Sequence, residues 1–212
     1  PAAAVLFGAV GAALTARVGR APAIALAVLV WAPTGASLAG LRGAYRAGVP
    51  DRATLELVDF LAARPDRGIV LAGPMLGHWI ETYGRHPVIA NSIHTNRAGN
   101  NDFARFCLTA EDPLAAAMLA RRHVRYVVVG EDLLLDIQQA ALALHVNAGR
   151  YLAPSGEAVV WTEAGRRLIL SRLYFDEGKG LSRFRPVFAS TVRAESPPGP
   201  RYRVYEVAEG RR

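Results

Sequence analysis

The hydrophobic pattern divides the chain into an apolar beginning and a longer remainder in which apolar positions recur with the periods of helices and strands. Residues 1–16 contain no charged side chain, and residues 21–41 again contain none. About 20 apolar residues span a hydrocarbon core of about 30 Å. We therefore expect transmembrane helices within residues 1–41, the first of them truncated, although both stretches could instead form buried core helices of a soluble protein.

The charges around these stretches predict an orientation. Arg17 and Arg20 lie in the short connection between them, and positive charge in a short loop favours the cytoplasmic side. The second span then delivers everything after it to the extracytoplasmic face. We expect a location in the inner (plasma) membrane, a linker over residues 42–53, and an extracytoplasmic (periplasmic) α/β domain over residues 54–212.

Beyond the linker, helical and strand-like periods follow one another. Apolar residues at helical spacing predict helices over Pro50–Arg64, Gly77–Tyr83, Leu114–His123, Asp132–Asn147 and Thr162–Leu173. Apolar runs predict strands over Ile69–Ala72, Val88–Ala90, Val124–Val129, Phe184–Ser190 and Tyr202–Val207, the last two forming an antiparallel pair. Asp112 is expected to cap the third helix, and the polar residues 93–105 are expected to form a loop. This order predicts a mixed α/β fold with Rossmann-like alternation of strands and helices.

The amino-acid composition and charge restrict the classes of binding partner that we expect for this chain. The formal net charge is +7, but the positive side chains are almost all arginine and are scattered along the chain. No cluster of them alternates with aromatic residues as a nucleic-acid face would. We expect no nucleic-acid partner, whereas membrane lipids remain as anionic partners. The single cysteine, Cys107, excludes an intrachain disulfide and a cysteine-based zinc site.

The segment from Gly73 to Thr95 carries the candidate site residues. A buried strand leads into a glycine-rich turn at Gly73–Gly77, and the helix that follows carries His78 and Trp79. A strand, a turn and a helix in this order suit a ligand site at the mouth of a sheet. Trp79 could stack on a sugar or a lipid headgroup, or anchor the domain at a membrane interface.

The loop after the second expected strand is rich in neutral polar side chains. Asn91, His94 and Asn96 offer hydrogen-bond donors and acceptors that fit a hydroxyl-rich ligand. The alternative is that the loop caps its own backbone.

The sequence lacks motifs of established catalytic chemistry. His78 and Glu81 stand three residues apart and could share a metal, but the His-Glu-x-x-His spacing of zinc proteases does not occur. There is no Gly-x-Ser-x-Gly elbow, and no Gly-Lys-Ser/Thr follows Gly77. We therefore expect no metal site and no evident cofactor in this chain, and we assign no catalytic residue.

The order of features along the chain is itself informative. A helix over Thr54–Ala63 is followed by a strand, the Gly73–Gly77 turn, a short helix, the segment Arg85-His-Pro-Val-Ile-Ala-Asn91, a helix over Asp112–Arg122 and the strand Val124–Val129. The tail contains Ser171–Tyr174, Phe184–Phe188 and Tyr202–Val207. From Thr54 to Val207, this series resembles the C-terminal part of the oligosaccharyltransferase catalytic-subunit family, which are membrane glycosyltransferases of the GT-C type.

One motif departs from the pattern of that family. The family's Trp-Trp-Asp-Tyr-Gly falls on Gly73, Pro74, Met75, Leu76 and Gly77, where only the last glycine is shared. In the family, the two tryptophans and the aspartate bind the hydroxyl residue of the acceptor sequon. The side chains of Pro74, Met75 and Leu76 cannot form that polar contact.

The resemblance implies the C-terminal fragment of an integral-membrane enzyme that transfers a glycan from a polyprenyl-phosphate-type carrier to an acceptor. It also implies a lipid-linked sugar donor and an acceptor as partners, and a divalent metal, Mg or Mn, in the parent protein. His78, Trp79, Asn91 and Asn96 would lie nearest the acceptor. We expect the catalytic groups to lie before Pro1 and this chain alone to be inactive. The alternative is a non-catalytic, membrane-anchored domain that binds glycan or protein.

Overall fold

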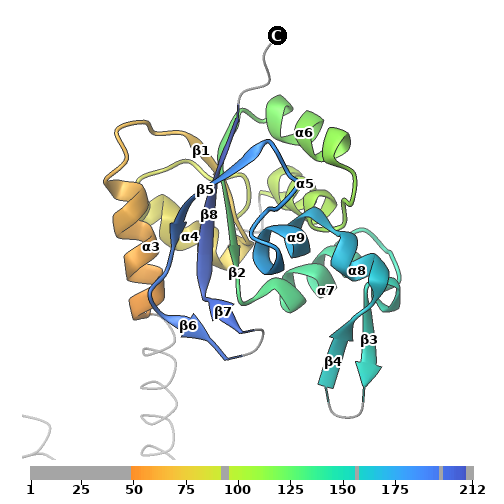
Figure 1. The fold of residues 1–212 in the computed structure, drawn as a ribbon. Helices are drawn as coiled ribbons and strands as arrows, with labels where there is room; N and C mark the ends of the chain where they lie inside the picture. The colour runs from red at the N-terminus through yellow and green to blue at the C-terminus, as the bar shows by residue number, and fades with distance from the viewer. Residues whose placement is uncertain (1–48, 92–95, 156–157, 196–197, 209–212) are drawn as a thin grey trace, which may run out of the picture. The chain divides into compact units, whose positions relative to one another are not determined.

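The computed structural model describes residues 49–91, 96–155, 158–195 and 198–208 (Figure 1). From Pro50 onward, they belong to a compact unit that comprises Pro50–Arg212. The transmembrane helices expected within residues 1–41 lie outside the described residues. Among the helices that the structure does describe, none has the length and apolar character needed to cross a membrane.

A four-stranded sheet in the order β1, β2, β8, β5 forms the centre of the unit (Figure 1). The strands β1 (Ile69–Leu71) and β2 (Val124–Gly130) are parallel, and β8 (Tyr202–Val207) pairs antiparallel with both β2 and β5 (Phe184–Ala189). The predicted mixed α/β fold is therefore confirmed, as is the antiparallel pairing of the last two strands. The valine-rich sequence of β2 agrees with its central position, because both faces of this strand are buried.

The two faces of the sheet have separate cores. Alternate side chains of a strand point to opposite faces, and β2 follows this rule from Tyr126 to Val129. Tyr126 and Val128 pack in the cluster formed with α3 (Arg52–Ala62), whereas Val127 and Val129 pack in the larger cluster on the other face. The larger cluster draws on helices that come later in the chain, which are α5 (Arg97–Cys107), α6 (Asp112–Arg121), α7 (Leu133–Ala143) and α9 (Ile169–Phe175).

The polar segment 93–105 was expected to be a loop, but most of it is helical. Residues 92–95 lie outside the described part, and α5 begins at Arg97. Phe103, Phe106 and Cys107 recur at helical spacing and are buried in the larger core. Their burial stabilises the helix, and this outweighs the turn preference of the asparagines in its first half.

The prediction for the segment after β1 needs two corrections. The expected turn at Gly73–Gly77 is helical, because α4 (Pro74–Trp79) begins at its proline, a residue favoured in the first helical turn. A single π-helical turn, η1 (Ile80–Gly84), follows directly. The expected strand Val88–Ala90 is reduced to one parallel bridge between Val88 and Val70.

Three smaller features also differ from expectation. Glu111, not Asp112, occupies the N-cap of α6, and Asp112 instead pairs with Arg172. The helix expected over Thr162–Leu173 is broken at Leu168, whose ψ of 140° is extended. The break divides it into α8 (Glu163–Arg167) and α9. The structure also contains elements that the sequence did not predict, which are η2 (Ala148–Arg150), the hairpin of β3 (Leu152–Ser155) and β4 (Ala158–Trp161), and the short pair of β6 (Arg193–Ala194) and β7 (Gly199–Pro200).

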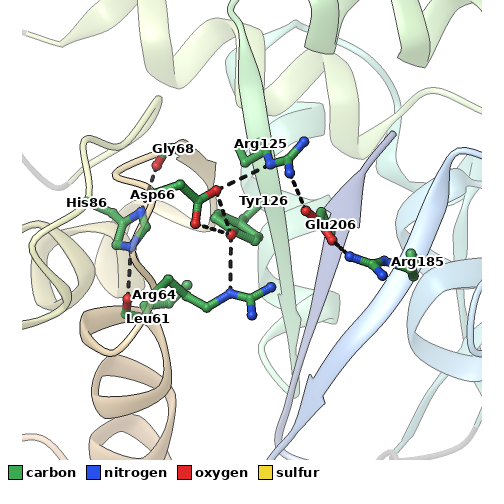
Figure 2. A network of polar contacts seen from close by, with 9 residues as sticks. All are labelled: Leu61, Arg64, Asp66, Gly68, His86, Arg125, Tyr126, Arg185 and Glu206. Carbon is green, nitrogen blue, oxygen red and sulfur yellow. Dashed lines mark hydrogen bonds and ion pairs between the residues drawn. The ribbon is translucent and has the colours of Figure 1, made fainter. Parts of the chain in front are cut away.

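A network of polar contacts closes the amino edge of the parallel pair, where β1 and β2 begin (Figure 2). The hydroxyl of Tyr126 donates to the Asp66 carboxylate at 2.8 Å and accepts from Arg64 Nε at 3.2 Å. Arg125 pairs with Asp66 and with Glu206, and Arg185 pairs with Glu206 from the other side. Each carboxylate of this network thus faces a hydrogen-bond donor or an arginine.

A buried histidine belongs to the same edge. Both ring nitrogens of His86 face backbone carbonyl oxygens, Nδ1 at 2.7 Å from Gly68 and Nε2 at 2.9 Å from Leu61 (Figure 2). Leu61 lies in the last turn of α3, and Gly68 directly precedes β1. The imidazole therefore ties the end of a helix to the start of a strand.

Candidate functional site

The carboxyl edge of the parallel pair is where the candidate site forms. β1 ends at Leu71 and leads through Gly73 into α4, and β2 ends at Gly130 and leads through Asp132 into α7. Ligands of α/β sheets bind outside the carboxyl ends of parallel strands, where the following loops meet. In this chain, that edge brings the beginning of α4 together with the first turn of α7.

A close contact between Gly73 and Asp136 defines the centre of this edge. A Cβ atom placed on Gly73 would lie 2.9 Å from Oδ1 of Asp136, which is half-buried on α7. A larger residue at position 73 would therefore displace the carboxyl group. The glycine leaves room for Asp136 against the beginning of α4.

Asp136 has an unusual acidity for a carboxyl group. Burial raises its pKa to about 7, and the neighbouring carboxylate of Asp132 adds to the rise. Among the residues that the structure describes, no arginine and no hydrogen-bond donor offsets this effect. The Asp136 carboxyl also adds to the effect of burial in raising the pKa of the Cys107 thiol. Asp136 can therefore donate or accept a proton near neutral pH.

Further charges surround Asp136 on the same edge. Arg201 pairs with Glu131 and, at 2.7 Å, with Asp51. Burial and the Glu131 carboxylate raise the pKa of Asp132, which Arg201 only partly opposes. Arg201 thus pairs with two carboxylates and partly offsets a third, but it does not offset Asp136. The edge therefore favours ligands that offer hydrogen-bond donors or positive charge.

The aromatic residues expected at the site lie on the outer side of α4 and η1. His78 is exposed and Trp79 is half-buried, with 5.7 Å between their ring centroids. The indole of Trp79 stacks on the ring of Tyr83, with centroids 5.6 Å apart and an interplanar angle of 24°. The structure therefore brings His78 and Trp79 together and adds Tyr83, a residue that the sequence did not single out.

The motif positions Gly73–Gly77 have different environments. Met75 is 68% exposed, whereas Pro74 and Leu76 are half-buried. Gly77 is buried, and a Cβ atom there would lie 2.0 Å from the carbonyl oxygen of Ala90. The shared glycine is therefore required for the close approach of α4 to the segment before Asn91.

The two asparagines of the expected site belong to one hydrogen-bond network. The backbone N–H of Asn91 donates to Oδ1 of Asn100 at 3.2 Å, and its side-chain amide donates to Glu81 at 3.3 Å. Asn96 donates to the carbonyl of Ile89 at 3.0 Å and to Oδ1 of Asn91 at 3.4 Å. These contacts hold the ends of the loop against its own backbone. His94 lies outside the described residues.

Asp132 and Asp136 are not among the site residues predicted from the sequence. A signal for them exists in the printed sequence, because Asp136 interrupts the apolar run Leu133–Ile137 one helical turn after Asp132. An acidic residue within an apolar helical run that directly follows a buried strand falls on the carboxyl edge of the sheet.

The described residues do not fit the divalent metal that the resemblance implies. Among them, no group of three or more His, Cys, Asp or Glu side chains is arranged to hold a metal ion.

Comparison with solved structures identifies the fold. No protein-family model and no curated protein matches the chain. The crystal structure of the C-terminal globular domain of oligosaccharyltransferase from Archaeoglobus fulgidus matches with a TM-score of 0.53 and 19% identity, over 76% of this chain and 99% of that domain. The apo structure of an oligosaccharyltransferase from the same organism matches with a TM-score of 0.72 and 15% identity, over 93% of this chain and 37% of that one.

The fold is therefore that of the C-terminal portion of archaeal oligosaccharyltransferases, and the resemblance predicted from the sequence is confirmed at this level. A further structure, of the A. fulgidus enzyme tethered to an acceptor peptide containing an NVT sequon, matches with a TM-score of 0.69 and 17% identity, over 92% of this chain and 31% of that one. The chain thus spans about a third of the longer structures that it matches.

Proposed function

We propose that this chain is the C-terminal part of an integral-membrane glycosyltransferase that transfers a glycan from a polyprenyl-phosphate-type carrier to an acceptor. The unit Pro50–Arg212 would lie on the extracytoplasmic side of the membrane and form the acceptor-facing wall of the site. The fold supports this proposal. One similar structure holds a tethered acceptor peptide, and another holds an inhibitory peptide and a dolichol-phosphate.

The contact of Asp136 with Gly73 is the observation that carries the proposal. At the carboxyl edge of the sheet, this half-buried carboxyl has a pKa raised to about 7 by burial and lacks a hydrogen-bond partner among the described residues. A buried carboxyl group without a partner costs free energy, which a ligand with a hydroxyl or amide group would offset. Asp136 would thus supply from α7 the polar contact that Met75 cannot supply from α4.

The substitution Asp136→Asn in the membrane-bound full-length protein tests this role. We expect kcat/KM for the acceptor to fall by about tenfold or more, mainly through KM, since one hydrogen bond to a charged group is worth about 1.5–3 kcal/mol. The assay is transfer from a lipid-linked donor in membranes. Asp59→Asn, which changes an exposed carboxylate on α3, is the matched control and should transfer like the wild type. Wild-type transfer by Asp136→Asn would exclude Asp136 from acceptor recognition.

A non-catalytic, membrane-anchored glycan- or protein-binding domain is the second candidate. The observation that favours it is the apolar and aromatic surface of Met75, Trp79 and Tyr83, which begins at a position of the family's recognition motif and continues along the helix after it. Trp79→Ala would then weaken glycan binding in a protein that performs no transfer. The enzyme would instead be favoured if the wild-type protein transfers glycan and Trp79→Ala loses this transfer only at low acceptor concentration.

A further inference from the structure

A groove of about 340 Å³ lies between the ends of three helices on the α5–α7 side of the sheet. It is lined by Arg105, Leu108 and Thr109 from the end of α5 and the residues after it, by Leu114, Met118 and Arg121 from α6, and by Leu144, Val146 and Tyr151 from the chain after α7. This volume is within the range of about 300–1,000 Å³ that is typical of ligand pockets. The groove lies at the opposite end of α7 from Asp136, so it is separate from the carboxyl edge of the sheet.

The floor of the groove is apolar. Leu108, Met118 and Leu144 pack against the larger core and also line the groove. Leu114 is 51% exposed, and Val146 is also exposed. A contiguous group of exposed apolar side chains around a groove often marks an interaction site, whereas single exposed leucines do not.

One rim of the groove has excess positive charge. The Asp102 carboxylate is shared by Arg121 at 3.0 Å, by Arg105 at 3.8 Å and by Arg122. Three guanidinium groups with one carboxylate leave two uncompensated positive charges. Arg105 and Arg121 line the groove and are exposed, so several of their donors remain available to a ligand.

The acidic residues of α6 do not cancel this charge. Asp112 stands at the first turn of α6, whereas Arg121 stands at its last residue, and the Asp112 carboxylate pairs with Arg172. Glu111 precedes the helix at the same distant end. The rim at Arg105 and Arg121 therefore presents a positive surface directly beside an apolar floor.

We propose that this groove docks a short peptide segment of a partner protein in which apolar side chains adjoin a carboxylate. Charge complementarity and the apolar floor specify this occupant, since leucine-sized side chains fill the floor and a neighbouring carboxylate reaches Arg121 or Arg105 in the fork geometry that guanidinium groups favour. The proposal is independent of the function proposed for the carboxyl edge.

Fluorescence anisotropy of the full chain in a non-ionic detergent tests the proposal. The probes are an arrayed set of labelled eight-residue peptides that contain leucine and aspartate in varied order, with leucine–lysine peptides of the same patterns as controls. We expect members of the acidic set to bind more tightly than about 1 mM and to weaken as salt is added, because exposed charge pairs are screened. The basic set should not bind.

Matched variants locate the binding. Leu114→Asp should weaken binding by about tenfold or more, because burial of a leucine is worth about 1.5–3 kcal/mol. Leu135→Asp changes a leucine on α7 that is 46% exposed and lies outside the groove, and it should leave binding within about twofold of the wild type. Arg121→Gln should weaken binding of the acidic peptides, whereas Arg166→Gln, on α8, should not.

Four results would overturn the proposal. The first is that no acidic peptide binds, and the second is that Leu114→Asp and Leu135→Asp bind alike. The third is that the chain binds phosphatidylglycerol vesicles through Leu114 but binds no peptide, which would make the occupant a lipid surface. The fourth is concentration-dependent self-association that Leu114→Asp abolishes, which would make the occupant a second copy of this chain. Equal melting temperatures of the two leucine variants show that both are folded.

Discussion

The two edges of the parallel pair β1–β2 balance their charged groups in opposite ways. At the amino edge, burial alone would raise the pKa of Asp66, but hydrogen bonds that include those from Tyr126 and Arg125 outweigh it, and the pKa is lowered. At the carboxyl edge, burial raises the pKa of Asp136 to about 7, and no donor among the described residues opposes it. The same residue type thus has its acidity shifted in opposite directions at the two edges.

This difference separates a structural role from a functional one. A carboxylate whose partners are in place stabilises the fold, whereas a half-buried carboxyl group without partners destabilises it. Carboxyl groups of the second kind cluster at sites that receive ligands. We infer that the amino edge with its arginines belongs to the fold, and that the carboxyl edge is kept for a ligand.

The pH dependence of stability should show the largest effect. The folded-state pKa of Asp136, about 7, lies above its ordinary value of 3.8, so the folded protein binds this proton more tightly than the unfolded chain. The contribution of Asp136 to stability is then most favourable below about pH 4 and declines as the pH rises to about 7. Relative to Asp136→Asn, we expect the wild-type free energy of unfolding to fall by up to about 4 kcal/mol over that range.

Urea unfolding of the full chain at a series of pH values measures this difference. Asp59→Asn serves as the control, because Asp59 is exposed on α3 and its removal should leave the pH profile of the wild type unchanged. If Asp136→Asn and Asp59→Asn give the same profile, the carboxyl edge holds no destabilising carboxyl group and the contrast between the edges fails.

Removing the buried imidazole should have the second largest effect. His86→Phe removes both ring nitrogens that face the carbonyl oxygens of Gly68 and Leu61, so the carbonyl that accepts the ring N–H loses this donor in a buried position. We expect a loss of about 2–3 kcal/mol in the free energy of unfolding. His78→Phe, which changes an exposed ring on α4, should change stability by less than about 0.5 kcal/mol. Equal losses in the two variants would contradict the structural role of the amino edge.

Removing one hydroxyl group should have the smallest effect. Tyr126→Phe keeps the buried ring but removes the group that donates to Asp66 and accepts from Arg64. The expected loss is about 1–2 kcal/mol, since Arg125 still pairs with Asp66. Tyr83→Phe removes an exposed hydroxyl and should be neutral. A neutral Tyr126→Phe would mean that the network contributes little to the amino edge.

The sequence predicted the elements whose own pattern decides their structure. β2 contains the apolar run Tyr126–Val129 followed by Gly130, and it forms where expected because that run is buried on both faces of the sheet. α3 begins after Asp51, which accepts a hydrogen bond from the backbone N–H of Thr54 at 2.8 Å. In α5, by contrast, the asparagines indicated a loop, although Phe103, Phe106 and Cys107 recur at helical spacing. The helix is stabilised by the packing of these three residues in the core, which the local sequence does not reveal.

The site was less predictable than the fold, because its central contact joins residues that are distant in sequence. Gly73 and Asp136 stand 63 positions apart, as their numbers show, and meet only because β1 and β2 are neighbours in the sheet. The motif comparison located Gly73–Gly77 as the place where the family's chemistry is missing. It could not show that a carboxyl group from another helix lies against the same position.

The most direct test of the account is a pH titration of the Asp136 carboxyl carbon by NMR, in protein labelled at aspartate. The signal is assigned by its absence from Asp136→Asn. We predict a midpoint near pH 7, as burial requires, and a shift of that midpoint when a ligand with hydroxyl or amide groups binds at the carboxyl edge. A midpoint near the ordinary value of 3.8 that no such ligand moves would contradict the claim that this edge holds a carboxyl group kept for a ligand.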